Sequence, residues 1–133
     1  MPNYSGEVAQ LVAGDFRQIP WQVTNVPSSG AVTKAWFTVK ADAADADVDA
    51  IFQKMITETL VLAEGHITNT GAVGNVATGF FNLLPADTIL LAPLTPYVYD
   101  IQLYIAMTDL SVRIETPEIG TITALDGVTD AVS

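Results

Sequence analysis

Regular alternation of apolar and polar residues constrains the fold of this chain more than any other feature of its sequence. In residues 97–105 (YVYDIQLYI), every second side chain is a tyrosine, isoleucine or leucine, and Asp100 and Gln102 lie between them. Residues 31–40 (AVTKAWFTVK) alternate in the same way. A period of two places successive side chains on opposite faces of a β-strand, so one face can be buried. Both segments are therefore predicted to be half-buried strands.

Three further segments are predicted to be extended. Residues 16–25 form one strand, and residues 76–83 form another that follows a glycine-rich loop. After a polar turn, residues 111–125 return beside residues 97–105 as one or two strands of a hairpin. Pro117 has no backbone N–H to donate, so we expect an edge, a bulge or a strand break there.

One short helix is predicted at about residues 46–56. Its apolar residues recur at helical spacing, its preceding aspartates favour the positive end of a helix dipole, and a lysine lies near the opposite end. These apolar residues are Val48, Ile51, Phe52 and Met55, and the lysine is Lys54. A single helical turn is predicted at residues 85–88 (PADT), capped by Asp87 or Thr88. The pattern as a whole predicts a mostly β, antiparallel sandwich with one short inserted helix.

Length and composition predict one domain over residues 1–133. Half of the residues are hydrophobic, which excludes a disordered chain, and the absence of cysteine excludes disulfide scaffolds and a cysteine nucleophile. We expect the ends, residues 1–8 and 126–133, to be extended or disordered. No apolar run approaches the roughly 20 residues of a spanning helix, and the N-terminus lacks signal-peptide features. We therefore expect no membrane contact.

The charge of the chain argues against nucleic acid as a partner. Fifteen acidic residues against five basic ones leave a formal net charge of -10. Binding to phosphates needs clustered lysine and arginine, whereas the five basic residues here are scattered.

Asp45, Asp47 and Asp49 are the candidate metal ligands, because hard cations prefer several carboxylate oxygens from one tight loop. A calcium loop that began at Asp45 would need glycine where Ala50 lies and glutamate where Ile56 lies. We therefore favour a helix start for these aspartates, and we predict no bound metal and no cofactor.

No residue combination predicts catalysis. His66 is the single histidine, and no serine lies in a G-x-S-x-G turn that would expose a nucleophile. Asp100 interrupts an apolar strand, and we place it on the polar face of that strand. We predict no catalytic residue and expect that the protein is not an enzyme.

Apolar residues beyond the needs of a core are predicted to form a contact surface. The interface candidates are Trp36, Tyr104, Leu91 and Leu94. Aromatic side chains at strand spacing also allow a carbohydrate- or ligand-binding module, assisted by calcium at the aspartates. Both functions therefore stay open on residue types alone.

Several short motifs follow one another along residues 10–130 in a specific order. They are Gly14-Asp15 before a strand, Trp36 to Lys40 (WFTVK), the segment 41–54 (ADAADADVDAIFQK), Pro85-x-Asp87-Thr88, residues 97–103 (YVYDIQL) and residues 120–123 (GTIT). This series resembles the immunoglobulin-like β-sandwich domains of tailed-phage virion proteins, including the N-terminal domains of baseplate upper proteins. The segment around Pro117 departs from that pattern, which has a Thr-Ile pair before the last glycine.

This resemblance implies a non-enzymatic structural or assembly protein of a tailed bacteriophage or prophage particle. Such a protein would act through contacts with other virion proteins or with further copies of itself. It would reside in the virion after assembly in the cytoplasm of the host bacterium. The resemblance carries over no catalytic residue.

Overall fold

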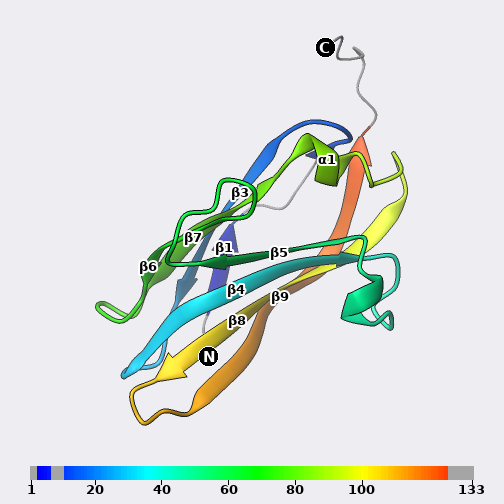
Figure 1. The fold of residues 1–133 in the computed structure, drawn as a ribbon. Helices are drawn as coiled ribbons and strands as arrows, with labels where there is room; N and C mark the ends of the chain where they lie inside the picture. The colour runs from blue at the N-terminus through cyan, green and yellow to red at the C-terminus, as the bar shows by residue number, and fades with distance from the viewer. Residues whose placement is uncertain (1–2, 7–10, 126–133) are drawn as a thin grey trace.

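Two β-sheets pack face to face in the computed structural model, which describes residues 3–6 and 11–125 (Figure 1). The first sheet has the strand order β1 (Asn3–Gly6), β3 (Arg17–Thr24), β7 (Ala77–Leu83) and β6 (Gly65–Thr70). The second has the order β2 (Leu11–Val12), β9 (Val112–Leu125), β8 (Pro96–Met107), β4 (Gly30–Lys40) and β5 (Phe52–Thr57). Neighbouring strands are antiparallel, except that β2 runs parallel to β9. The predicted mostly β, immunoglobulin-like sandwich is confirmed.

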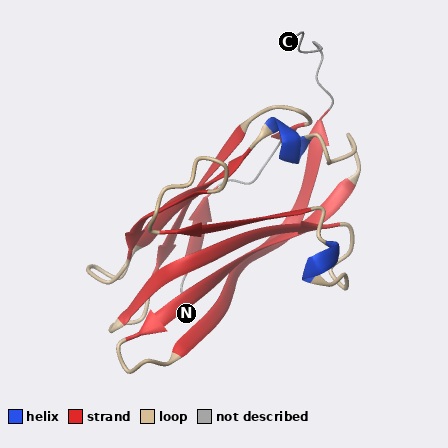
Figure 2. Ribbon diagram, viewed as in Figure 1, coloured by secondary structure: helices blue, strands red, loops and turns tan. Residues whose placement is uncertain are grey.

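Helical structure is confined to two short segments in the described part of the chain (Figure 2). They are a 3₁₀ turn, η1 (Asp47–Asp49), and one α-helical turn, α1 (Pro85–Thr88). Neither is long enough to cross a bilayer.

The alternating segments form the centre of the second sheet, as predicted. β4 pairs with β5 on one side and with β8 on the other, and β8 pairs in turn with β9. In β8 the side chains of every second residue from Tyr97 to Ile105 face the first sheet and are buried. The intervening residues, among them Asp100 and Gln102, lie on the outer face. The period-two pattern therefore determined correctly which face of each strand is buried.

Phe37 lies at the centre of the core and joins the two sheets. Its side chain is fully buried, and its ring centroid lies 5.5 Å from that of Phe81 on β7 of the opposite sheet. On its own sheet it stacks against Tyr99 at 5.6 Å and against Phe52 at 6.3 Å. Protein interiors pack as densely as organic crystals, so moving one sheet over the other would disrupt these ring contacts. The contacts therefore hold the two sheets in a defined relative position.

Pro117 lies within β9, where the pairing with β8 shifts register. Ile101 pairs with Glu118 and Leu103 with Glu115, so the ladder is irregular around the proline. The bulge expected from the missing N–H is thus confirmed, and β9 continues through it as one strand of 14 residues.

The helix predicted at about residues 46–56 is wrong. Only η1 is helical there, and β5 begins at Phe52. The reason is a second pattern in the same residues. Every second side chain, at Phe52, Lys54 and Ile56, is buried, which is the period of a strand, and this strand pairs with β4. Val48, which we assigned to the buried stripe, is 89% exposed.

The ends of the chain are described in part. Residues 3–6, within the N-terminal segment expected to be extended or disordered, form β1 and pair with β3. Positions 1–2, 7–8 and 126–133 of the predicted ends lie outside the described residues.

Two phenylalanines allow a matched test of this core. Phe37→Ala should lower the free energy of unfolding by about 3–5 kcal/mol, because it leaves a cavity between the sheets. Phe16 is 53% exposed, so Phe16→Ala should change stability by about 0.5 kcal/mol or less. Urea denaturation of both variants measures the difference. Similar losses in the two variants would contradict the central place given to Phe37.

Candidate functional site

A charged residue occupies an inward position at the edge of the second sheet. Lys54 lies on β5 between Phe52 and Ile56, and its side chain is 6% exposed. Burying an ammonium group is costly unless opposite charges and hydrogen-bond acceptors surround it. The neighbourhood of Lys54 therefore has to supply such partners.

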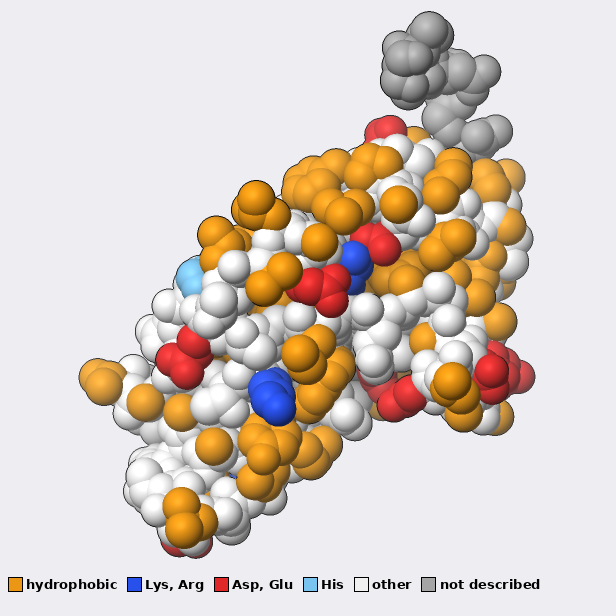
Figure 3. All heavy atoms as spheres, in the orientation of Figure 1, with side chains coloured by type: hydrophobic (Ala, Val, Ile, Leu, Met, Phe, Trp, Pro, Cys, Tyr) orange, Lys and Arg blue, Asp and Glu red, His pale blue; other side chains and the backbone are white. Residues whose placement is uncertain are grey.

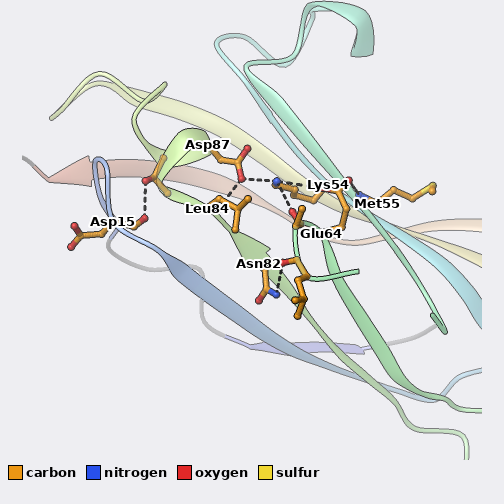
Figure 4. A network of polar contacts seen from close by, with 10 residues as sticks. Asp15, Lys54, Met55, Glu64, Asn82, Leu84 and Asp87 are labelled. Carbon is orange, nitrogen blue, oxygen red and sulfur yellow. Dashed lines mark hydrogen bonds and ion pairs between the residues drawn. The ribbon is translucent and has the colours of Figure 1, made fainter. Parts of the chain in front are cut away.

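Three acceptors surround the Lys54 ammonium (Figure 4). Nζ lies 2.5 Å from Oδ2 of Asp87 on α1 and 3.2 Å from Oε2 of Glu64 in the loop before β6. Nζ also donates a hydrogen bond of 2.9 Å to the carbonyl oxygen of Ala63. We call Lys54, Glu64 and Asp87 the lysine triad. An ammonium has three N–H donors, and each finds an acceptor here.

The lysine triad joins segments that are distant in the sequence. Asp87 Oδ2 also accepts a hydrogen bond of 2.8 Å from the backbone N–H of Leu84, so of the two predicted capping residues, Asp87 and Thr88, Asp87 makes this contact at the start of α1. Nearby, Asn82 donates from Nδ2 to the carbonyl oxygen of Leu62 at 3.0 Å. The loop between β5 and β6 is therefore attached to both sheets by polar contacts (Figure 4).

The outer face of the second sheet carries exposed apolar side chains. Met55 on β5 pairs with Trp36 on β4, and Ile114 on β9 pairs with Tyr104 on β8. The Trp36 and Tyr104 rings meet edge to face at a centroid distance of 6.4 Å, and Lys34 lies over the Tyr104 ring. We call Trp36, Met55, Tyr104 and Ile114 the outer apolar face.

The four interface candidates lie in different environments. Trp36 and Tyr104 come together on the outer apolar face, half-buried. Leu94 is 72% exposed near α1, where other hydrophobic side chains also gather at the surface (Figure 3). Leu91 is fully buried and belongs to the core, so it is not available to a partner. Its position after the α1 turn directs it inward, which the sequence alone did not reveal.

The candidate metal ligands do not converge. Asp45 accepts a hydrogen bond from the backbone N–H of Asp42, and Asp47 pairs with Lys40 at 2.8 Å. This pairing raises the pKa of Lys40. Among the described residues, no group of three or more acidic or histidine side chains could hold a metal ion. Asp42 and Asp45 instead accept backbone hydrogen bonds in the turn after β4, and η1 has no side-chain cap, so the aspartates do not start a helix. Figure 3 shows acidic side chains gathered over the segment between β4 and β5.

A small hollow lies on the second sheet, beside the start of the loop between β4 and β5. Its volume is about 200 Å³, and it is lined by Thr38, Lys40, Ala43, Val98, Tyr99, Asp100 and Ile119. Burial raises the pKa of Asp100, and the nearby Lys40 opposes this shift. Sites for drug-sized ligands usually measure roughly 300–1,000 Å³, so this hollow suits only a small group.

His66 has a structural contact. It lies at the start of β6, and its Nε2 is 2.9 Å from the carbonyl oxygen of Glu58. No hydrogen bond between His66 and a serine or a carboxylate is present among the described residues. The observed contact of His66 is therefore with a backbone carbonyl and not with a nucleophile.

Sequence reasoning missed the lysine triad. The signal was present in FQKMIT, where Lys54 takes the place of an apolar residue in a period-two series. We assigned these residues to a helix and so placed Lys54 near its C-terminal end. Its partners could not be found from spacing, because Glu64 and Asp87 lie 10 and 33 positions further along.

Comparison with known proteins supports the fold alone. No known protein family and no curated protein sequence matches the chain. It is similar to a chain in a structure reported as the basis of T cell specificity and activation by the bacterial superantigen toxic shock syndrome toxin-1. That similarity has a TM-score of 0.51 and 8% identity, and it covers 94% of this chain and 100% of that one. At so low an identity it supports the fold and nothing about function.

Two further similarities are more distant. Murine CRIg gives a TM-score of 0.48 at 10% identity, covering 96% of this chain and 98% of that one. AggA, the major subunit of aggregative adherence fimbriae type I from Escherichia coli, gives 0.43 at 12% identity, with 96% and 95% covered.

Two lysines allow a matched test of the lysine triad. Lys54→Met should lower the free energy of unfolding by about 2–3 kcal/mol, because Asp87 and Glu64 would lose the buried charge that they share. Lys40 also pairs with an aspartate, but Asp47 is 73% exposed, so Lys40→Met should have a small effect. Thermal and urea unfolding of both variants measure the contrast. Equal effects would show that burial adds nothing to the triad.

Asp100 should make stability depend on pH. Since burial raises its pKa in the folded state, the folded protein favours protonated Asp100, and this contribution is lost as the pH rises through that pKa. Asp100→Asn has no charge to bury, so it should be more stable than the parent near neutral pH. The difference should shrink at acidic pH, where Asp100 is protonated. Urea unfolding across this range measures it, and a constant difference would contradict the burial argument.

Proposed function

We propose that this chain is a non-enzymatic structural protein of a tailed-bacteriophage or prophage particle. It acts by protein–protein contacts made through the outer apolar face of the second sheet. The particle is assembled in the cytoplasm of the host bacterium. Its partners are other virion proteins or further copies of the same chain.

The outer apolar face is the observation that carries this proposal. Trp36, Met55, Tyr104 and Ile114 come from four adjacent strands of one sheet. Met55 and Ile114 are 42% and 53% exposed, so their side chains gain from being covered by another protein. A contiguous apolar surface of this kind is typical of protein contact sites.

The composition of this face supports a protein as its partner. Aromatic residues and methionine are enriched where proteins contact one another, and charged residues are depleted at the centres of such contacts. Trp36 and Tyr104 lie at the middle of the sheet, with Lys34 over the Tyr104 ring, and most of the described acidic residues lie elsewhere, as in the loop between β4 and β5. The net charge of -10 keeps free copies apart before assembly.

The assignment to a phage particle rests on the resemblance of the motifs along residues 10–130. The segments that carry it lie where such a sandwich needs them: Gly14-Asp15 precedes β3, and residues 97–103 lie in β8. Carbohydrate binding stays an alternative prediction. It has less support, because the Trp36 and Tyr104 rings meet edge to face and do not form a flat stacking platform.

A single charge placed in the outer apolar face tests the proposal. Ile114→Glu should reduce incorporation of the chain into particles by about tenfold or more, since burying an unpaired carboxylate at a contact costs about 2 kcal/mol or more. The matched control is Gln22→Glu, at an exposed position on β3 of the opposite sheet. Particles purified from the phage or prophage that encodes the chain are analysed by quantitative mass spectrometry.

Each outcome of this experiment has a defined meaning. Incorporation of the control but not of Ile114→Glu supports both the particle and the contact face. Equal incorporation of the two variants rules out this face as the contact. Absence of the parent chain from the particles rules out the virion assignment.

A further inference from the structure

We propose that Lys54 and Asp87 become joined covalently by an amide bond between Nζ of the lysine and Cγ of the aspartate. The lysine triad places an amine and a carboxyl group in direct contact, with Nζ 2.5 Å from Oδ2. The two side chains are 6% and 17% exposed, so little solvent reaches them. This inference concerns a modification inside the domain and does not depend on the proposed function.

Both reacting groups are held in fixed orientations. The carbonyl oxygen of Ala63 accepts a hydrogen bond from Nζ at 2.9 Å, and the N–H of Leu84 donates one to Oδ2 of Asp87 at 2.8 Å. Two reactants held in contact react as fast as if one of them were present at about 10⁵–10⁸ M, provided that the geometry suits attack. A reaction that is negligible between free amines and acids in water can therefore proceed within a folded domain.

Glu64 is the group that can move the protons. Its Oε2 lies 3.2 Å from Nζ, on the same ammonium that contacts Asp87. A carboxylate within hydrogen-bond reach of a reacting amine can act as a general base and then as a general acid. Glu64 is thus placed for catalysis of the bond, while Lys54 and Asp87 are consumed by it.

The reaction is balanced without any external reagent. A proton first passes from Nζ to the Asp87 carboxylate, which converts the ion pair into an amine and a carboxylic acid. Only the unprotonated amine has a lone pair for attack, so this transfer comes first. The lone pair of Nζ then attacks Cγ, and Glu64 takes a second proton from the nitrogen. Glu64 returns this proton to the departing hydroxyl group, so one water molecule leaves and the amide remains.

The bond would connect the two sheets. Lys54 belongs to β5 at the edge of the second sheet, whereas Asp87 lies in α1, directly after β7 of the first sheet. It would close a covalent loop from residue 54 to residue 87 at the end where α1 lies (Figure 4). The chain contains no cysteine, so a disulfide cannot make such a connection.

Trypsin digestion of the denatured protein tests this bond. Trypsin cuts after free lysine and arginine, and within residues 41–113 these are Lys54 and the terminal Arg113. If the amide bond has formed, Lys54 resists cleavage, and mass spectrometry finds one peptide of residues 41–113 that is lighter by one water molecule. If only the ion pair exists, peptides 41–54 and 55–113 appear at full mass, and the proposal is overturned.

Variants distinguish the bond from other losses of water. Lys54→Arg keeps a cation for Asp87 but lacks the amine, so it should be cut at that position with no loss of mass. Glu64→Gln should slow bond formation by about a hundredfold, and the exposed Glu58→Gln should leave it unchanged. Circular dichroism confirms that each variant is folded. Loss of water with full cleavage after Lys54 would indicate a succinimide at an aspartate and would contradict the proposal.

Discussion

Packing of aromatic side chains between the two sheets is the interaction on which the rest of this structure depends. Phe37 contacts Phe81 across the interior, and this contact holds β4 against β7. Because β4 is the strand to which both β5 and β8 pair, its position determines the register of the second sheet. The side chains on one face of each central strand are buried in this core, so the side chains on the other face point outward. Trp36 and Tyr104 lie on that outer face for this reason, beside Lys34 and not among the core residues.

Core packing also explains why the lysine triad exists. β5 continues the inward alternation of the sheet, so the side chain of Lys54 has to enter the interior between Phe52 and Ile56. A buried ammonium needs partners, and these come from the loop before β6 and from the capped turn α1. The cap of α1 and the charge on β5 thus use the same carboxylate, that of Asp87. One side chain stabilises the start of a helical turn and the edge of a sheet, and this coupling places it beside the lysine amine.

The acidic and the apolar side chains of the surface lie over different elements. The acidic residues that the sequence concentrates between β4 and β5 cap turns and pair with Lys40, away from the centre of the sheet. The outer apolar face lies across the strands themselves, where side chains are rigidly spaced. An apolar surface beside a strongly acidic loop is suited to a specific protein contact, because the charge limits association in other orientations. That division supports the protein contact proposed for this chain.

The sequence by itself determined the sandwich and the inward faces of the central strands, and it limited Pro117 to an edge, a bulge or a break and the cap of α1 to Asp87 or Thr88. These depend on local patterns: alternation, a missing N–H and a side chain three residues from a backbone donor. It could not decide residues 46–56, where a helical stripe and a strand alternation overlap, because pairing with β4 and burial of Phe52 selected the strand. Nor could it show that Leu91 is buried, or that Lys54, Glu64 and Asp87 meet. Such contacts join residues far apart in the chain, and only the packing of the two sheets brings them within reach.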